Sequence, residues 1–182
     1  LGFGASRTMR IAQKLYEGIN IGSETTGLIT YMRTDGVQLS SQAIEELRNE
    51  ISNRHGKSYI PDNPRVYKSK AANAQEAHEA IRPTDIARDP ESISNYLDAE
   101  QLKLYDLIWK RTISSQMQSA ELDETAADIS SKDQSITFRA NGSQVIFRGF
   151  FDYRDKEDDR LLPNLNEKEE VDLSKVESDQ HF

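Results

Sequence analysis

The chain has 182 residues, a formal net charge of −8 and no cysteine. Its length suits one ordinary domain or two small ones, and the lack of cysteine excludes disulfides and thiolate metal sites. No apolar run approaches the roughly 18 residues that a membrane helix needs, and the first residues lack a secretion signal. We therefore expect a soluble protein without a membrane partner.

The negative charge is confined to the second half of the chain. Residues 1–116 carry 15 basic and 15 acidic side chains, whereas residues 117–182 carry 8 and 16. Binding to nucleic acid is driven largely by Lys and Arg. A basic site in the first half therefore stays possible despite the net charge.

An apolar period of 3.6 predicts that residues 1–116 are mostly helical. The expected helices cover about residues 7–17, 73–81 and 99–117, another starts at Ser40 or Ser41 and stops at Gly56, and a short strand covers about residues 27–32. Ser6 and either Ser40 or Ser41 fit N-cap positions, and Asp98 with Gln101 has the spacing of a capping box.

Beyond about residue 120 the apolar period shortens to two, which is typical of strands. Asn141-Gly142 stands between two β-favouring runs, so we expect a hairpin with strands at about 135–140 and 143–151. The sequence predicts an α+β chain, with a helical domain over residues 1–116 and a β-rich part over residues 117–182.

The segment "GLITYMRTDG" (27–36) places polar residues directly behind a buried-looking strand. A tyrosine hydroxyl ordinarily titrates at about 10, so a nucleophilic Tyr31 needs neighbours that stabilise its anion or accept its proton. Arg33 lies two residues on, on the same side of a strand, and a guanidinium can hold phosphate oxygens in pairs. The alternative is that Tyr31 packs on the core and Arg33 is its solvated neighbour.

A second cluster is "NAQEAHEAIRPTD" (73–85). The H-E-x-x-H zinc motif needs a second histidine at position 82, and Arg82 stands there, so we reject a zinc protease. On a helix His78 and Arg82 would share one face and suit an anion such as phosphate. The alternative is a surface helix whose glutamates balance the local charge.

Four stretches together resemble the bacterial topoisomerase I family of type IA DNA topoisomerases. They are "LGFGASRTMRIAQKLYEG" (1–18), "ITYMRTD" (29–35), "AQEAHEAIRPTD" (74–85) and "LYDLIWKRTISSQM" (104–117). The resemblance runs in order over nearly the whole chain. Topoisomerase III enzymes typically have proline where this chain has Met32, whereas reverse gyrase shares much of the same core and stays an alternative.

The resemblance assigns roles to individual residues. Tyr31 matches the nucleophile that attacks single-stranded DNA and becomes linked to a 5′ phosphate, and Arg33 matches an arginine beside the scissile phosphate. His78 matches a histidine near the active site, either as proton relay or as phosphate contact. The other positions expected to contact DNA are Arg7, Thr34, Asp35 and Arg82.

The resemblance also implies what the complete enzyme contains. It would be a cytoplasmic, nucleoid-associated monomer that relaxes negatively supercoiled DNA without ATP. A separate N-terminal metal-binding domain of the same polypeptide would supply Mg²⁺ chemistry, so we assign no metal to this chain. Residues 117–182 would form part of the β-rich arch that opens as a gate.

Two departures from the family pattern concern the site. Gly36 stands where serine usually follows "RTD", which removes one hydroxyl, and Ala71 with Ala72 dilutes the basic character before His78. Two other classes of function stay open. One is a DNA-binding module without chemistry, in which Tyr31 packs or stacks on a base, and the other is a protein-interaction domain.

Overall fold

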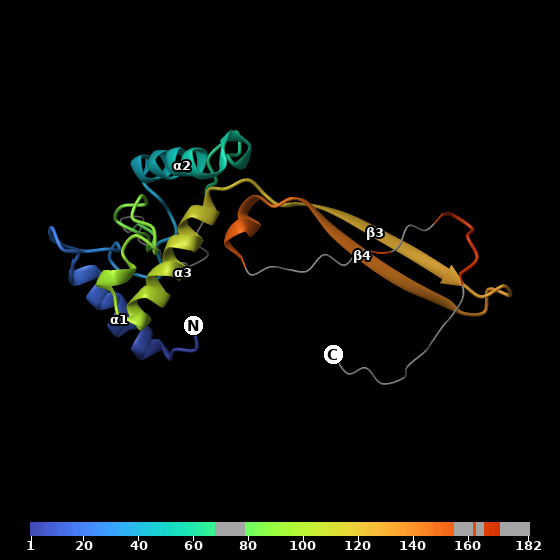
Figure 1. Ribbon diagram of the computed structural model, residues 1–182, viewed down its shortest axis with the longest axis horizontal. Coiled ribbons are helices and arrows are strands. Elements are labelled where there is room, and N and C mark those ends of the chain that lie inside the picture. Colours follow the sequence, from blue (N-terminus) through green and yellow to red (C-terminus); the bar gives the residue numbers. More distant parts are fainter. Residues whose placement is uncertain (68–78, 155–161, 163–165, 172–182) are drawn as a thin grey trace. The chain divides into compact units, whose positions relative to one another are not determined.

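A computed structural model describes residues 1–67, 79–154, 162 and 166–171 (Figure 1). The chain forms two compact units. The helical unit contains Leu1–Ser119 and Gly149–Asp155, and the ribbon unit contains Ala120–Arg148 and Lys156–Phe182. The expected domain boundary after residue 116 lies close to Ser119, where the chain first leaves the helical unit. The return of residues 149–154 to that unit was not predicted.

In the described part of the helical unit there are three α-helices: α1 (Ala5–Glu17), α2 (Ser41–His55) and α3 (Ala99–Ser115). The short elements β1 (Ile19–Asn20), β2 (Thr25–Thr26), η1 (Lys57–Tyr59) and η2 (Ser94–Tyr96) lie between them, and η3 (Gly149–Tyr153) joins the unit later in the chain. β1 and β2 pair as an antiparallel hairpin. The α+β class expected from the sequence is confirmed. Among the described residues, no helix is both long and apolar enough to cross a bilayer.

The predicted caps of the two longer helices are confirmed. The Ser40 side chain accepts a hydrogen bond from the backbone N–H of Ala43 at the start of α2. Asp98 and Gln101 form the predicted capping box of α3. The Ser6 cap is wrong, because Gly4 holds the N-cap position of α1 and Thr8 already donates its N–H to the Gly4 carbonyl, 3.0 Å away.

One apolar core joins the three helices. Its largest fully buried side chains come from all three helices and from the segment after β2: Leu15, Leu28, Ile29, Leu47, Ile51, Tyr105 and Ile113. Each such side chain stabilises the fold by about 1.5–3 kcal/mol relative to an exposed position. The apolar stripes predicted from the 3.6 period therefore face one another.

The helix predicted over residues 73–81 is wrong for its described part. Residues 79–81 are not helical, and residues 73–78 lie outside the described residues. Glu79 forms a parallel bridge with Gln38, and the Ala80 N–H donates to the Gln38 carbonyl at 2.8 Å. The backbone here therefore bonds to Gln38, about 40 positions earlier, and not to the preceding turn of a helix.

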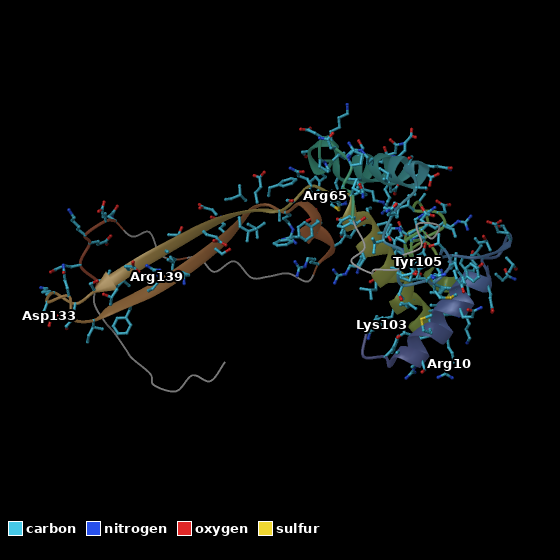
Figure 2. All side chains as sticks on the ribbon, turned by 180° about the vertical axis from the view of Figure 1, so that it is seen from behind. Arg10, Arg65, Lys103, Tyr105, Asp133 and Arg139 are labelled. Carbon is cyan, nitrogen blue, oxygen red and sulfur yellow. The ribbon has the colours of Figure 1, made fainter. Side chains whose placement is uncertain are left out.

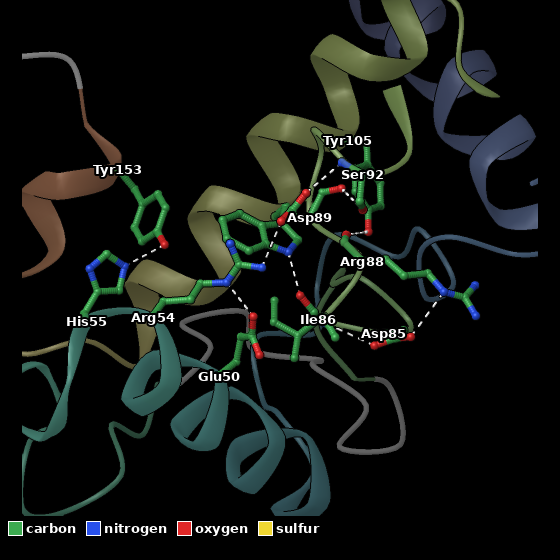
Figure 3. A network of polar contacts seen from close by, with 12 residues as sticks. Glu50, Arg54, His55, Asp85, Ile86, Arg88, Asp89, Ser92, Tyr105 and Tyr153 are labelled. Carbon is green, nitrogen blue, oxygen red and sulfur yellow. Dashed lines mark hydrogen bonds and ion pairs between the residues drawn. The ribbon is translucent and has the colours of Figure 1, made fainter. Parts of the chain in front are cut away.

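Polar contacts fix the loop of residues 85–92 on α2 and α3 (Figure 3). Trp109 Nε1 donates to the Ile86 carbonyl at 2.8 Å, and the Tyr105 hydroxyl donates to the Arg88 carbonyl at 2.7 Å. Arg54 of α2 reaches Asp89 at 2.9 Å. The loop directly follows residues 82–84, which bond to the segment that carries Tyr31.

The ribbon unit contains a two-stranded antiparallel ribbon of β3 (Glu121–Ser130) and β4 (Thr137–Phe147). The Asn141-Gly142 turn is wrong, because both residues lie within β4, opposite Ala126 and Thr125. The chain turns instead at residues 131–136, where Asp133 accepts hydrogen bonds from Ser131 and Ser135. These bonds lower the pKa of Asp133, labelled in Figure 2, to about 2.

Candidate active site around Tyr31

Tyr31 is exposed on a segment whose other large apolar side chains are buried. Its residue surface is 54% exposed, whereas Leu28 and Ile29 are each 1% exposed and Met32 is 6% exposed. The expected strand at 27–32 is reduced to a single antiparallel bridge between Ile29 and Pro83. The buried neighbours anchor the segment and leave the Tyr31 ring at the surface.

Backbone hydrogen bonds hold this segment on both sides. The Leu28 N–H donates to the Leu15 carbonyl of α1 at 2.7 Å. On the other side, the Thr30 N–H donates to the Arg82 carbonyl at 2.9 Å, and the Thr84 N–H donates to the Leu28 carbonyl at 3.0 Å. Residues 82–84 therefore form the support on which the tyrosine segment rests.

Threonine hydroxyls add further bonds between the same two segments. Thr30 Oγ1 accepts from the Arg82 N–H at 3.0 Å and donates to the Ala80 carbonyl at 2.9 Å. Thr84 Oγ1 donates to the Gly27 carbonyl at 2.7 Å. The two bonds of Thr30 are partly buried, so loss of its hydroxyl would leave the Ala80 carbonyl and the Arg82 N–H without this partner.

Gly27 allows the segment to approach α1 closely. A Cβ atom at this position would lie 2.4 Å from the Tyr16 carbonyl oxygen, well inside van der Waals contact. The Tyr16 side chain in turn contacts Tyr31 edge to face, with ring centroids 5.4 Å apart and planes at 65°. Such pairs favour one relative orientation, so the end of α1 positions the exposed phenol.

Arg33 and Asp35 follow Tyr31 in a tight turn. The Arg33 N–H donates to the Tyr31 carbonyl at 2.9 Å. Arg33 Nε contacts both carboxylate oxygens of Asp35, at 2.8 and 2.9 Å, and the Arg33 side chain is 39% exposed. The predicted turn at Thr34 and Asp35 is confirmed. Gly36 does not have a positive φ, so its backbone conformation does not require glycine.

Arg82 is held in the protein by a dense set of contacts. Its Nε and Nη2 donate to Glu79 at 2.9 and 3.1 Å, and its Nη1 donates to the Pro83 carbonyl at 2.9 Å. The side chain is 16% exposed. These contacts give Arg82 a structural role, and its contact with DNA stays a prediction.

The prediction that His78 and Arg82 share one face of a helix is wrong, because residues 79–82 are not helical. His78 itself lies outside the described residues. Arg7 stands elsewhere on the helical unit, where it pairs with Glu100 of α3 and lies 5.2 Å from the Phe3 ring centroid. Its contact with DNA also stays a prediction.

Glu79 joins the support of the tyrosine segment to α2. Its Oε1 accepts the Ser40 N–H at 2.9 Å, in addition to the bonds from Arg82. Burial alone would raise the pKa of Glu79, but the hydrogen bonds from Arg82 and Ser40 outweigh it and lower the pKa below the ordinary 4.5. Glu79 is therefore a charged link between three segments of the chain.

We expect Glu79→Gln to lower the free energy of unfolding at pH 7 by about 1–3 kcal/mol, because it leaves Arg82 without its carboxylate. A lowered pKa means that the carboxylate stabilises the fold above pH 4.5 and loses this effect as the pH falls through the lowered value. Urea unfolding at pH 7 and at low pH should show the two proteins converging in acid. Glu45→Gln, on the exposed side of α2, is the control. An equal loss at both pH values would contradict this role.

Within the described ranges, no group of three or more His, Asp or Glu side chains is arranged to hold a metal ion. Sequence reasoning missed the residues that support the site, namely Gly27, Thr30, Glu79 and Thr84. The available signal was the run of small and β-branched residues beside the tyrosine motif. This run did not reveal which residues bond to it, because the bonds of Thr30 and Thr84 join residues that are 50 or more positions apart in the chain.

The comparisons with known proteins define the class of this chain. The family model described as DNA topoisomerase matches residues 1–182, and the chain belongs to that family. It is 51% identical to DNA topoisomerase 1 of Rickettsia conorii, 46% to that of Xylella fastidiosa and 45% to that of Helicobacter pylori. Each match covers 100% of this chain and 24% of the relative.

A solved structure of full-length topoisomerase I from Thermotoga maritima is similar to this one. Its TM-score is 0.79 at 38% sequence identity, over 93% of this chain and 26% of that protein. The chain therefore spans about a quarter of the length of the relatives that it matches.

Proposed function

We propose that this chain carries the nucleophile of a type IA DNA topoisomerase, and that the nucleophile is Tyr31. The observation that carries the proposal is the exposure of Tyr31, at 54%, between residues that are almost fully buried. A tyrosine that merely packs on the core would be buried. Family membership over the whole chain supports the same residue, because Tyr31 stands in the motif that resembles the catalytic one.

The proposed reaction exchanges one phosphodiester for another. Tyr31 Oη attacks a phosphorus atom of single-stranded DNA, a Tyr31 Oη–P bond forms, and the bond from phosphorus to the 3′ oxygen breaks. The phenolic proton leaves Tyr31 and the departing 3′ oxygen gains a proton. The 5′ phosphate stays on the protein, so the reverse attack reseals the strand without ATP.

Arg33 is the second residue that we assign to this reaction. Its side chain is partly exposed, and Asp35 fixes its orientation through Nε. A guanidinium in a fixed orientation can bind phosphate oxygens in pairs and offset their negative charge. We assign His78 to the same site from the family resemblance alone, where it would either relay a proton or contact a phosphate.

The complete enzyme would relax negatively supercoiled DNA by passing a strand through the transient break. The ribbon of β3 and β4 would be part of the gate, and the enzyme would act as a cytoplasmic monomer. The described residues do not fit a Mg²⁺ site. From the family resemblance we assign the ion to a metal-binding domain elsewhere in the polypeptide, and the reaction proposed for Tyr31 is written without it.

The isolated chain of 182 residues is expected to form no covalent adduct with single-stranded DNA in the presence of Mg²⁺. The full-length enzyme should form one under the same conditions, because it would add the metal-binding domain. End-labelled oligonucleotides, stopped with detergent and separated by size, measure the adduct, and circular dichroism checks that the isolated chain keeps its helices. An adduct with the isolated chain would contradict the proposal that cleavage also needs the metal-binding domain. No adduct with the full-length enzyme would contradict the proposed function.

A further inference from the structure

A basic flank of α1 is not used by the reaction described above. It consists of Arg7, Arg10 and Lys14, which are all exposed. Since an α-helix turns by about 100° per residue, these three side chains lie within about 60° of one another. They span about 10 Å along the helix axis at ~1.5 Å per residue. Figure 2 labels Arg10, together with Lys103 of α3.

The basic flank borders a surface hollow. Its volume is about 420 Å³, and its lining adds Ile11 and Glu100 to the three basic residues. Glu100 pairs with Arg7. Within the part of the chain that the structure describes, Arg10 and Lys14 make no ion pair and no side-chain hydrogen bond. The hollow therefore keeps an excess of positive charge.

An aromatic ring lies at the edge of this flank. The Arg7 guanidinium is 5.2 Å from the Phe3 ring centroid, and the Lys103 ammonium is 5.6 Å from it on the α3 side. Cations arranged around an aromatic ring suit a strand with unpaired bases, since the cations attract phosphates and a ring can stack on a base. Three cations over about 10 Å also match two or three phosphates of one strand, at ~3.4 Å or more per nucleotide.

The basic flank and Tyr31 lie on different sides of α1. Tyr16, which contacts Tyr31, is rotated by about 120–180° around the helix from the three basic residues. The buried residues Ile11, Ala12 and Leu15 lie between the two sides. Since a helix with side chains is about 10–12 Å wide, a strand on the basic flank is about three or more nucleotides from a phosphate at Tyr31.

We propose that the basic flank binds backbone phosphates of single-stranded DNA at a distance from the bond that Tyr31 breaks. This inference rests on the proposed function, because it takes DNA as the substrate. It adds a second contact that increases affinity for long strands and leaves the bond-breaking step unchanged. Arg10 and Lys14 carry most of the contact, because Arg7 is already paired with Glu100.

The test uses the full-length enzyme with Arg10→Gln and Lys14→Gln combined. Fluorescence anisotropy gives the Kd for a short strand of about 4 nucleotides with the cleaved bond at its centre, which does not reach the flank, and for a long one of about 25. We expect the Kd for the long strand to rise about 3- to 10-fold. The salt slope for the long strand should fall by about 1.4, which corresponds to two phosphates at ~0.7 each. The Kd and the covalent adduct of the short strand should not change.

Two matched variants accompany this test. Lys57→Gln with Arg111→Gln removes the same charge from two other exposed positions of the helical unit and should leave both Kd values unchanged. Arg10→Lys with Lys14→Arg keeps the charge and should restore binding of the long strand. An unchanged Kd for the long strand, or an equal loss for both strands, would overturn the inference. Formation of the adduct by the wild-type enzyme separates that outcome from failure of the proposed function.

Discussion

In the full-length enzyme, Tyr31→Phe is expected to abolish both the covalent DNA adduct and the relaxation of negatively supercoiled DNA. The substitution removes only the hydroxyl that forms the bond to phosphorus. The ring keeps its edge-to-face contact with Tyr16, and the surrounding segment stays anchored by Leu28 and Ile29. Non-covalent binding of single-stranded DNA should therefore change by no more than about twofold. A gel assay for the adduct and a plasmid relaxation assay measure the two losses.

The control for this substitution is Tyr16→Phe. Tyr16 contributes the neighbouring ring, is itself 40% exposed and loses the same atom. The Tyr16→Phe enzyme should still form the adduct. An adduct that persists in Tyr31→Phe would remove Tyr31 from its proposed role.

Gly27→Ala should have the second largest effect, although Gly27 takes no part in the chemistry. The added Cβ would lie 2.4 Å from the Tyr16 carbonyl oxygen, which is a backbone atom and cannot rotate away. The tyrosine segment or the end of α1 must move, and we expect a loss of about 1–3 kcal/mol in the free energy of unfolding. Because a displacement of about 1 Å can cost about 10²-fold in rate, adduct formation should slow by a similar factor.

Gly4→Ala provides the comparison for Gly27→Ala. A Cβ at Gly4 meets nothing within 4 Å, and this residue also belongs to the helical unit. The rate of adduct formation, measured in single-turnover experiments on the full-length enzyme, should be close to wild type for Gly4→Ala. If Gly27→Ala were equally active, the close approach to α1 would have no part in positioning Tyr31.

Local signals in the sequence predicted the longer helices. α2 and α3 begin at residues whose side chains bond the first N–H groups of the same helix, so a few neighbouring letters suffice. The Ser6 cap failed because the helix already starts at Ala5, so Ser6 lies inside α1 and not at the N-cap. The Asn141-Gly142 turn failed because β3, about 15 residues earlier, pairs along the whole of β4.

The candidate site was predictable only in part. The residue types and spacing of Tyr31 and Arg33 suggested their chemistry, and the family resemblance selected it over packing. The support for Tyr31 was not predictable, because it consists of contacts between residues 27–30 and residues 79–84. The helix expected over residues 73–81 was wrong for the same reason. The Glu79 carboxylate bonds to the Ser40 N–H and the Ala80 N–H bonds to the Gln38 carbonyl, and both partners are about 40 positions away in the chain.

Mapping the residue that becomes attached to DNA tests the central claim most directly. The full-length enzyme would be trapped on a labelled oligonucleotide, digested with trypsin and nuclease, and analysed by tandem mass spectrometry. Cleavage after Lys14 and Arg33 gives one peptide that contains both Tyr16 and Tyr31, so its fragment ions must distinguish the two tyrosines. We predict a 5′-phosphate on Tyr31. A phosphate on Tyr16 or on a residue outside this peptide would contradict the assignment.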